Sequence, residues 1–329
     1  MNQSWKKFLL GENASFENNQ IVFPTVDLEN HNRIYAVSNL SVLTVSGRDA
    51  VTFLQGQTTC NVNDISETKS GLGAFCTAKG RVITTFLLAK HNGDFLLVLP
   101  AELLAIIKKR LQMYILRADV VLTDSSDDIC LLGLLCPDDQ TGSIAVPDPL
   151  FTSYPQQDVL NQIALPQNRY LILAKPSKAI SLWSEKVGSQ HYRPDNSAHW
   201  SYLDIIDGIP WLTALTSEEF IPQMLNLDKL GGVSFNKGCY TGQEIVARTH
   251  YLGKSKREMR LAEGVMTLPP EPNTAIFDDD AGTEEVVGRV LQGLIHKNCC
   301  KMLIVIQVYD EKPHGLKLKN PDQNKITLI

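Results

Sequence analysis

One segment in the last third of the chain constrains the fold more than any other: Lys237-Gly-Cys-Tyr-Thr-Gly-Gln-Glu244. Two glycines bracket Cys239, and glycine adopts left-handed backbone conformations that let a chain turn sharply. Thr241 and Glu244 have the T-x-x-E spacing of a capping box, so a helix is expected to begin at Thr241. The pattern predicts a tight turn that presents the Cys239 thiol at the entry to a helix.

The position of Cys239 makes it a candidate reactive thiol. A helix N-terminus and a neighbouring cation, here Lys237, each lower the pKa of a thiol, and the thiolate is the reactive form. A buried cysteine beside a tight turn is the alternative, and the local sequence leaves both interpretations open.

Basic residues follow the expected helix. They form either a solvated surface or a cradle for an anion such as the glutamate tail of a folate or an RNA phosphate. These residues are Arg248, His250, Lys254, Lys256 and Arg257.

Length and composition are those of an ordinary globular chain. The 329 residues are enough for two or three domains, and 43% are hydrophobic. A formal charge of −5 argues against a general nucleic-acid coat protein, which needs concentrated Lys and Arg. The longest uncharged runs, residues 34–47 and 50–63, are shorter than the roughly 20 apolar residues of a membrane span. Only Phe8-Leu9-Leu10 follows Lys6-Lys7, so no signal peptide is expected.

The cysteines and histidines give little support to a metal site. Seven cysteines without a C-x-x-C spacing favour reduced thiols and a cytoplasmic location over disulfides or zinc binding. None of the seven histidines lies at H-x-x-H or H-x-x-x-H spacing.

The chain divides into stretches of different pattern. Residues 1–33 are polar and Asn-rich, and they are expected to form a loose N-terminal arm. Residues 73–89 predict two strands joined by a turn, and residues 100–116 predict a helix. A Pro-, Asp- and Ser-rich stretch at 137–166 predicts a long connection. Beyond residue 256, short apolar runs between Pro, Gly and Asp turns predict a small antiparallel β-barrel, and the fold class is α+β.

These features together resemble the YgfZ family, which is related to the glycine-cleavage aminomethyltransferase. The segment at 237–244 is similar to the signature of that family, to which Gly238, Tyr240, Thr241, Gly242, Gln243 and Glu244 belong with Lys237 and Cys239. Three further segments are similar in the same order along the chain: Phe53-Leu-Gln-Gly-Gln-Thr-Thr59, Ala78-Lys-Gly-Arg81 and Phe220-Ile-Pro-Gln-Met-Leu-Asn-Leu227. The resemblance spans roughly residues 35 to 325.

The resemblance implies a molecule of three parts around a central cleft. Two are α+β lobes of the aminomethyltransferase type, at residues 34–136 and 137–255, and the third is a C-terminal antiparallel β-barrel at 256–329. The cleft is expected to bind tetrahydrofolate, and Cys239 is expected to be the key functional residue. The expected partners of a monomer are iron–sulfur or tRNA-modifying client enzymes, with direct RNA contact left open.

Several positions depart from the related aminomethyltransferases. Those enzymes place an acid where this chain has Thr84 and Thr85, and neither threonine supplies the negative charge that the transfer needs. The Glu that holds the pterin ring is replaced by Ile206, so Asp207 is the carboxylate left at that turn.

The expected folate contacts are also altered. Trp200 corresponds to one of two tryptophans that the family associates with folate, and Leu40 stands at the position of the other. A core role is the alternative for Trp200. Arg248 is the candidate for the folate glutamate tail.

Three functions fit the sequence. The leading hypothesis is a tetrahydrofolate-binding accessory protein that supports iron–sulfur cluster assembly or repair and tRNA thiolation through a reactive cysteine. A folate-dependent aminomethyl or one-carbon transferase is disfavoured by Thr84 and Thr85. A folate-free protein that docks on iron–sulfur enzymes is favoured by Leu40 and Ile206.

Overall fold

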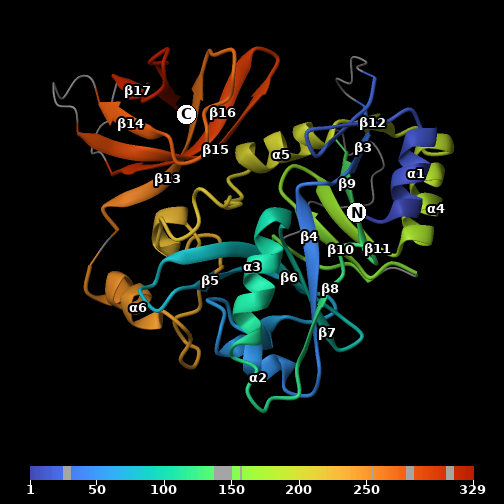
Figure 1. The fold of residues 1–329 in the computed structure, drawn as a ribbon, viewed down its shortest axis with the longest axis horizontal. Helices are drawn as coiled ribbons and strands as arrows, with labels where there is room; N and C mark the ends of the chain where they lie inside the picture. Colours follow the sequence, from blue (N-terminus) through green and yellow to red (C-terminus); the bar gives the residue numbers. More distant parts are fainter. Residues whose placement is uncertain (25–30, 137–149, 156–157, 254, 279–284, 309–314) are drawn as a thin grey trace. The chain divides into compact units, whose positions relative to one another are not determined.

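The computed structural model describes residues 1–24, 31–136, 150–155, 158–253, 255–278, 285–308 and 315–329 (Figure 1). The chain forms two compact units. The first unit comprises Met1–Leu54, Val62–Leu72 and Phe86–Trp200, and the second comprises Gln55–Asn61, Gly73–Thr85 and Ser201–Ile329. The three-lobe boundaries expected from the sequence remain a prediction.

One sheet of the first unit has the strand order β10-β11-β9-β3-β12. Its central strands are almost continuously apolar and buried, and β12 pairs with β3 in parallel. The strands are β3 (Arg33–Ala36), β9 (Cys130–Leu135), β10 (Asn161–Leu165), β11 (Arg169–Ala174) and β12 (Arg193–Asp195).

The N-terminal residues are not a loose arm, and that expectation is wrong. Helix α1 (Gln3–Gly11) is followed by a hairpin of β1 (Ser15–Glu17) and β2 (Gln20–Val22). The Asn2 side chain accepts hydrogen bonds from the first backbone N–H groups of α1, which caps the helix. Trp5 is buried with its ring edge-on to Trp183 of α4 (Pro176–Gly188) at 5.6 Å. Tertiary packing therefore orders a segment whose overall composition is polar.

A second sheet has the order β5-β6-β7-β4-β8. Strands β5 (Gly71–Cys76) and β6 (Val82–His91) confirm the predicted pair of strands, and the boundary between the two units runs through both. Helix α3 confirms the predicted helix and packs against β4, β7 and β8. The remaining elements are α3 (Ala101–Gln112), β4 (Leu40–Ser46), β7 (Asp94–Pro100), β8 (Val121–Asp124), α2 (Ala50–Gln55) and η1 (Val62–Asp64).

The C-terminal part of the second unit is a six-stranded antiparallel sheet in the order β17-β14-β15-β16-β13-β18. Alternate residues of β16, among them Met302, Ile304 and Ile306, are buried in its apolar core. The predicted series of short strands after residue 256 is thus confirmed as a sheet, while its closure into a barrel remains a prediction. The strands are β13 (Arg257–Gly264), β14 (Ala275–Asp278), β15 (Val286–His296), β16 (Cys299–Gln307), β17 (Leu316–Leu318) and β18 (Thr327–Leu328).

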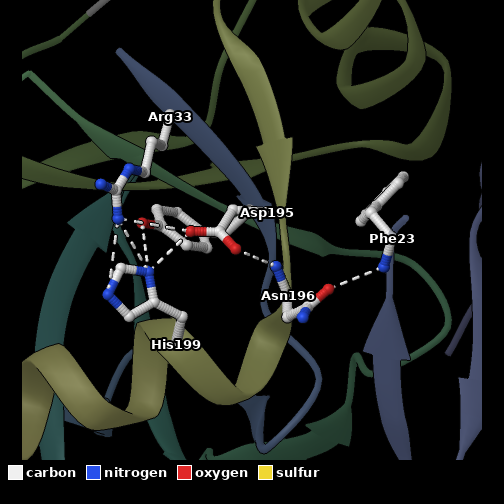
Figure 2. A network of polar contacts seen from close by, with 6 residues as sticks. Phe23, Arg33, Asp195, Asn196 and His199 are labelled. Atoms are coloured by element: carbon white, nitrogen blue, oxygen red, sulfur yellow. Dashed lines mark hydrogen bonds and ion pairs between the residues drawn. The ribbon is translucent and has the colours of Figure 1, made fainter. Parts of the chain in front are cut away.

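A buried ionic network joins β12, β3 and the start of α5 (Ser197–Ile206) in the first unit (Figure 2). His199 Nδ1 lies 2.6 Å from Asp195 Oδ2, Arg33 Nη1 lies 3.6 Å from the same oxygen, and the Tyr35 hydroxyl lies 3.1 Å from His199 Nδ1. Asp195 Oδ1 also accepts from the backbone N–H of Asn196. Because burial leaves little water to solvate these groups, each charge depends on its partners.

The pKa of Asp195 reflects this balance. Burial by itself raises the pKa of the carboxyl, but the hydrogen bond and charge of His199, the Asn196 N–H and Arg33 outweigh burial, so the net pKa lies below its ordinary value. A carboxylate with a depressed folded-state pKa stabilises the fold above its unfolded-state pKa, near 3.9, and loses that stabilisation as the pH falls through the folded-state value.

We expect Asp195→Asn to lower the free energy of unfolding by about 3 kcal/mol at neutral pH, because it leaves Arg33 and His199 buried without a carboxylate. The deficit relative to the parent should shrink as the pH falls below about 4, where the unfolded parent takes up the proton first, and should shrink further as the native carboxylate is protonated at its lower pKa. Urea denaturation monitored by circular dichroism between pH 3 and 7 measures both effects.

The matched control is Asp119→Asn. Its carboxylate pairs with Arg48 at 2.6 Å, but the two side chains are 47% and 89% exposed. The control should change stability by less than about 1 kcal/mol. A deficit of Asp195→Asn that does not vary with pH would contradict the role given to its charge.

Candidate functional site

Cys239 lies in the loop formed by the signature segment, in the second unit. It is exposed, whereas the other six cysteines are buried or half-buried, and all seven are free thiols. The sequence expectation of an exposed thiol at this turn is therefore met by the geometry. No group of three or more potential metal ligands occurs in the part of the chain that the structure describes.

Lys237 anchors this loop to the backbone at residues 58–60. Its Nζ donates to the backbone carbonyls of Thr58 at 2.7 Å and Cys60 at 2.6 Å, and it lies 5.1 Å from the centre of the Tyr240 ring. Desolvation lowers the pKa of Lys237 to about 8. The ammonium thus binds the backbone at residues 58–60, whereas the sequence predicted a nearby cation that would lower the pKa of the thiol.

The helix after the loop starts two residues later than the capping pattern predicts. Helix α6 runs from Gln243 to Tyr251, its N-cap is Gly242, and no side chain caps it. Thr241 instead donates its backbone N–H to the Gly56 carbonyl at 3.3 Å. The expected capping box between Thr241 and Glu244 is therefore wrong, because tertiary contacts take up the threonine.

Gly242 is the glycine on which this geometry depends. Its φ is +88°, and a Cβ built there would lie 2.4 Å from the Thr77 carbonyl oxygen and 3.0 Å from the Gly80 Cα. The backbone of the loop therefore lies directly against the turn between β5 and β6. A Cβ on Gly238 meets nothing within 4 Å, so only one of the two bracketing glycines is required sterically.

The two threonines at the expected acid position are fully buried, and their hydroxyls are satisfied. Thr85 Oγ1 donates to the Pro210 carbonyl at 2.5 Å, and Thr84 Oγ1 to the Thr85 carbonyl at 3.1 Å. These two side chains offer neither a carboxylate nor an accessible hydroxyl.

Trp200 is enclosed in the core of the first unit. A Cβ on Gly133 would lie 2.4 Å from the indole, and the buried Arg169 guanidinium lies 4.6 Å from the ring centre. Tyr35 packs against the same indole at 5.3 Å, and Leu40 is also buried. Trp200 and Leu40 therefore do not fit a role in stacking on a pterin ring, and Gly133 and Arg169 are structural partners that no local sequence pattern indicated.

Asp207 and Arg248 are more accessible than Trp200 and Leu40. Asp207 is half-buried just after α5, beside Gly208 with its φ of +70°, and Arg248 is exposed on α6. Both belong to the second unit with Cys239, whereas Trp200 and Leu40 belong to the first.

Within the described residues, no helix is long and apolar enough to cross a membrane.

Curated relatives match most of the chain, although no family model does. A protein of Vibrio atlanticus called tRNA-modifying protein YgfZ is 35% identical over 283 residues, covering 85% of this chain and 81% of the relative. A protein of the same name from Colwellia psychrerythraea is 36% identical and covers 73% of this chain and 74% of its own. The chain belongs to the YgfZ family.

A solved structure supports the fold of this YgfZ-family chain. The glycine cleavage system aminomethyltransferase T of Bartonella henselae superposes with a TM-score of 0.78 over 100% of this chain and 96% of its own, at 14% identity. At that identity the likeness concerns the fold alone. The predicted family membership and the predicted aminomethyltransferase-like α+β fold are both confirmed.

We expect Gly242→Ala to lower the free energy of unfolding by about 2 kcal/mol, because alanine disfavours a positive φ and its Cβ would overlap the Thr77 carbonyl. Gly238→Ala is the matched control and should stay within about 0.5 kcal/mol of the parent. Chemical denaturation of both variants measures the difference. Equal stability of the two would disprove the close approach at Gly242.

Proposed function

We propose that this YgfZ-family chain is a tetrahydrofolate-binding accessory protein that supports iron–sulfur cluster assembly or repair and tRNA modification, thiolation in particular. The observation that carries the proposal is the exposed Cys239 thiol, in a loop that Lys237 anchors by two hydrogen bonds. The relatives from Vibrio atlanticus and Colwellia psychrerythraea are called tRNA-modifying proteins, which supports the tRNA part of the role.

An accessory role fits the second unit better than aminomethyl transfer. Thr84 and Thr85 are uncharged and fully buried at the position where the related transferases are expected to carry acid. Without that negative charge, the cationic intermediates of a one-carbon transfer lose their stabilising partner. The thiol is then the chemically reactive group that remains in the signature segment.

Folate binding is proposed through the polar groups of the second unit. The Asp207 carboxylate can accept from the N–H edge of a pterin, and the Arg248 guanidinium can pair with a glutamate carboxylate. Trp200 and Leu40 are buried in the first unit, so we do not propose them as stacking contacts. Their burial also favours the second candidate, a folate-free protein that docks on iron–sulfur or tRNA-modifying enzymes.

We expect iodoacetamide to modify Cys239 before the other six cysteines at neutral pH, since alkylation needs an accessible thiol. Cys239→Ala should keep stability within about 0.5 kcal/mol of the parent but abolish support of tRNA thiolation in cells. Mass-spectrometric peptide mapping follows the labelling, and the thiolated nucleoside content of tRNA in complemented deletion cells follows the function.

The matched control is Cys299→Ala, which removes a half-buried thiol elsewhere in the same unit and should retain full function. Full complementation by Cys239→Ala would show that the thiol is not needed and that the signature loop has a structural role.

Tetrahydrofolate should raise the melting temperature of the parent, because a ligand that binds only the folded state stabilises it by about 2.7 kcal/mol at 100 times its Kd. Arg248→Ala and Asp207→Asn should each weaken binding by about tenfold through the loss of a charged hydrogen bond. Lys325→Ala, an exposed cation of the C-terminal sheet region, is the control and should bind like the parent. No shift with excess tetrahydrofolate would favour the folate-free docking protein.

A further inference from the structure

Three aromatic rings form a cluster where the last turn of α6, the orange helix of Figure 1, meets the segment before Cys239. The Phe235 ring stacks on the His250 ring at a centroid distance of 3.7 Å and an interplanar angle of 13°. The Tyr251 ring is nearly perpendicular to both rings, with its centroid 4.8 Å from His250 and 6.2 Å from Phe235. These distances place Tyr251 beside the His250 ring, so Tyr251 does not cover the face of His250 that points away from Phe235.

The cluster is open to solvent. Tyr251 is 63% exposed and the next residue, Leu252, is 82% exposed, while His250 is exposed and Phe235 is half-buried. Contiguous exposed apolar side chains mark a binding surface, whereas scattered ones need no explanation. Because the stack on Phe235 already orients His250, a partner meets a preorganised surface that loses little conformational freedom on binding.

Two cations accompany the rings. Arg248 is exposed three residues before Tyr251, a spacing that places both side chains on one face of α6, and Lys256 is exposed just before β13. In the part of the chain that the structure describes, neither cationic side chain has a hydrogen-bond or ion-pair partner. The neighbouring acid Glu258 is held by two other cations, so the charges of Arg248 and Lys256 remain available to an anionic partner.

We propose that Phe235, His250, Tyr251, Arg248 and Lys256 form an aromatic platform that binds a single-stranded segment of RNA. Unpaired bases stack on exposed aromatic rings through their flat faces, and this stacking does not require a hydrogen bond to a base edge. The two cations meet phosphates of the same strand. That the strand is RNA rests on the proposed function in tRNA modification, whereas the preference for unpaired bases rests on the rings.

The composition of the aromatic platform disfavours a protein partner. The core of a protein interface is depleted in lysine, and its affinity comes from side chains that are fully desolvated on both partners. Leu252 is the one large aliphatic side chain among the described residues 248–253, and unpaired cations stand before and after the rings in the sequence. Rings and cations with little aliphatic surface instead match a polyanion that carries flat bases.

The test is a fluorescence-anisotropy titration of the parent protein with a fluorescein-labelled single-stranded RNA of about 12 nucleotides. We expect this RNA to bind at least about tenfold more tightly than a fully paired RNA duplex of the same length, because paired bases offer no free face. Tyr251→Leu keeps apolar area but removes the ring, so it should weaken binding by about tenfold, whereas Tyr251→Phe should bind like the parent. The matched control is Tyr114→Leu, which alters a 42% exposed tyrosine of the first unit and should also bind like the parent.

The salt dependence separates the rings from the cations. For a single strand, the logarithm of the association constant falls with the logarithm of the salt concentration by about 0.7 for each phosphate contact. Lys256→Gln should therefore reduce this slope by about 0.7, whereas Tyr251→Leu should weaken binding and leave the slope unchanged.

Tetrahydrofolate binding is measured on the same variants, so failure of this proposal and failure of the proposed function give different results. Tyr251→Leu should bind tetrahydrofolate like the parent, since Tyr251 is not among the proposed folate contacts. No saturable binding of the single-stranded RNA at about 100 µM protein overturns the platform and leaves it to a protein partner, whatever the folate titration shows. Equal binding of single-stranded and duplex RNA, or parent-like RNA binding by Tyr251→Leu, overturns it as well.

Discussion

The candidate site depends on one close approach of backbone to backbone, between Gly242 and the turn of residues 77–80. No side chain fits between these segments, so the backbone of the signature loop is in direct contact with that turn. On the N-terminal side of Cys239 in the sequence, the Lys237 ammonium binds the carbonyls of Thr58 and Cys60. Cys239 lies between the two anchors, and the loop can present its thiol to solvent without the thiol taking part in packing.

Burial of the Lys237 ammonium has a desolvation cost, and neighbouring carbonyls offset part of it. Desolvation lowers the pKa of Lys237 to about 8, so between that pH and the unfolded-state value near 10.4 the unfolded chain binds more protons than the folded one. Stability associated with Lys237 therefore rises with pH across this window. At neutral pH the ammonium is retained because two short hydrogen bonds to carbonyls offset part of the desolvation. The anchored loop holds the Cys239 thiol in position. A preorganised group of this kind loses less conformational freedom when it meets a partner.

Patterns that depend on neighbours in sequence were predictable, and those that depend on distant neighbours were not. The strand pair around Gly80, helix α3 and the C-terminal strands follow from apolar periodicity and turn residues, and the structure confirms them. The start of α6 was missed because it depends on Gly242, which has a positive φ and lies against the Thr77 carbonyl, far away in sequence. Trp200 could not be assigned to the core from sequence, since its enclosing partners Gly133 and Arg169 come from two other strands. The N-terminal helix α1 did have a signal in the sequence: Asn2 is a helix cap, and the apolar residues Trp5 and Leu9 are four residues apart. Their polar surroundings obscured this signal.

Helix α6 meets the segment around Cys239 at both of its ends. Its nine residues span about 13 Å, with the thiol loop before its N-terminus and His250 in its last turn. The chain before Cys239 nonetheless returns to this last turn, because the Phe235 ring stacks on the His250 ring at 3.7 Å. The loop that carries the thiol is therefore tied to the helix at its start, through Gly242, and near its end, through Phe235. Because Gly242 fixes the start of α6 and the Gln223 side chain donates to the Val246 carbonyl within it, residues distant in sequence set the position of the helix beside the loop that carries the thiol.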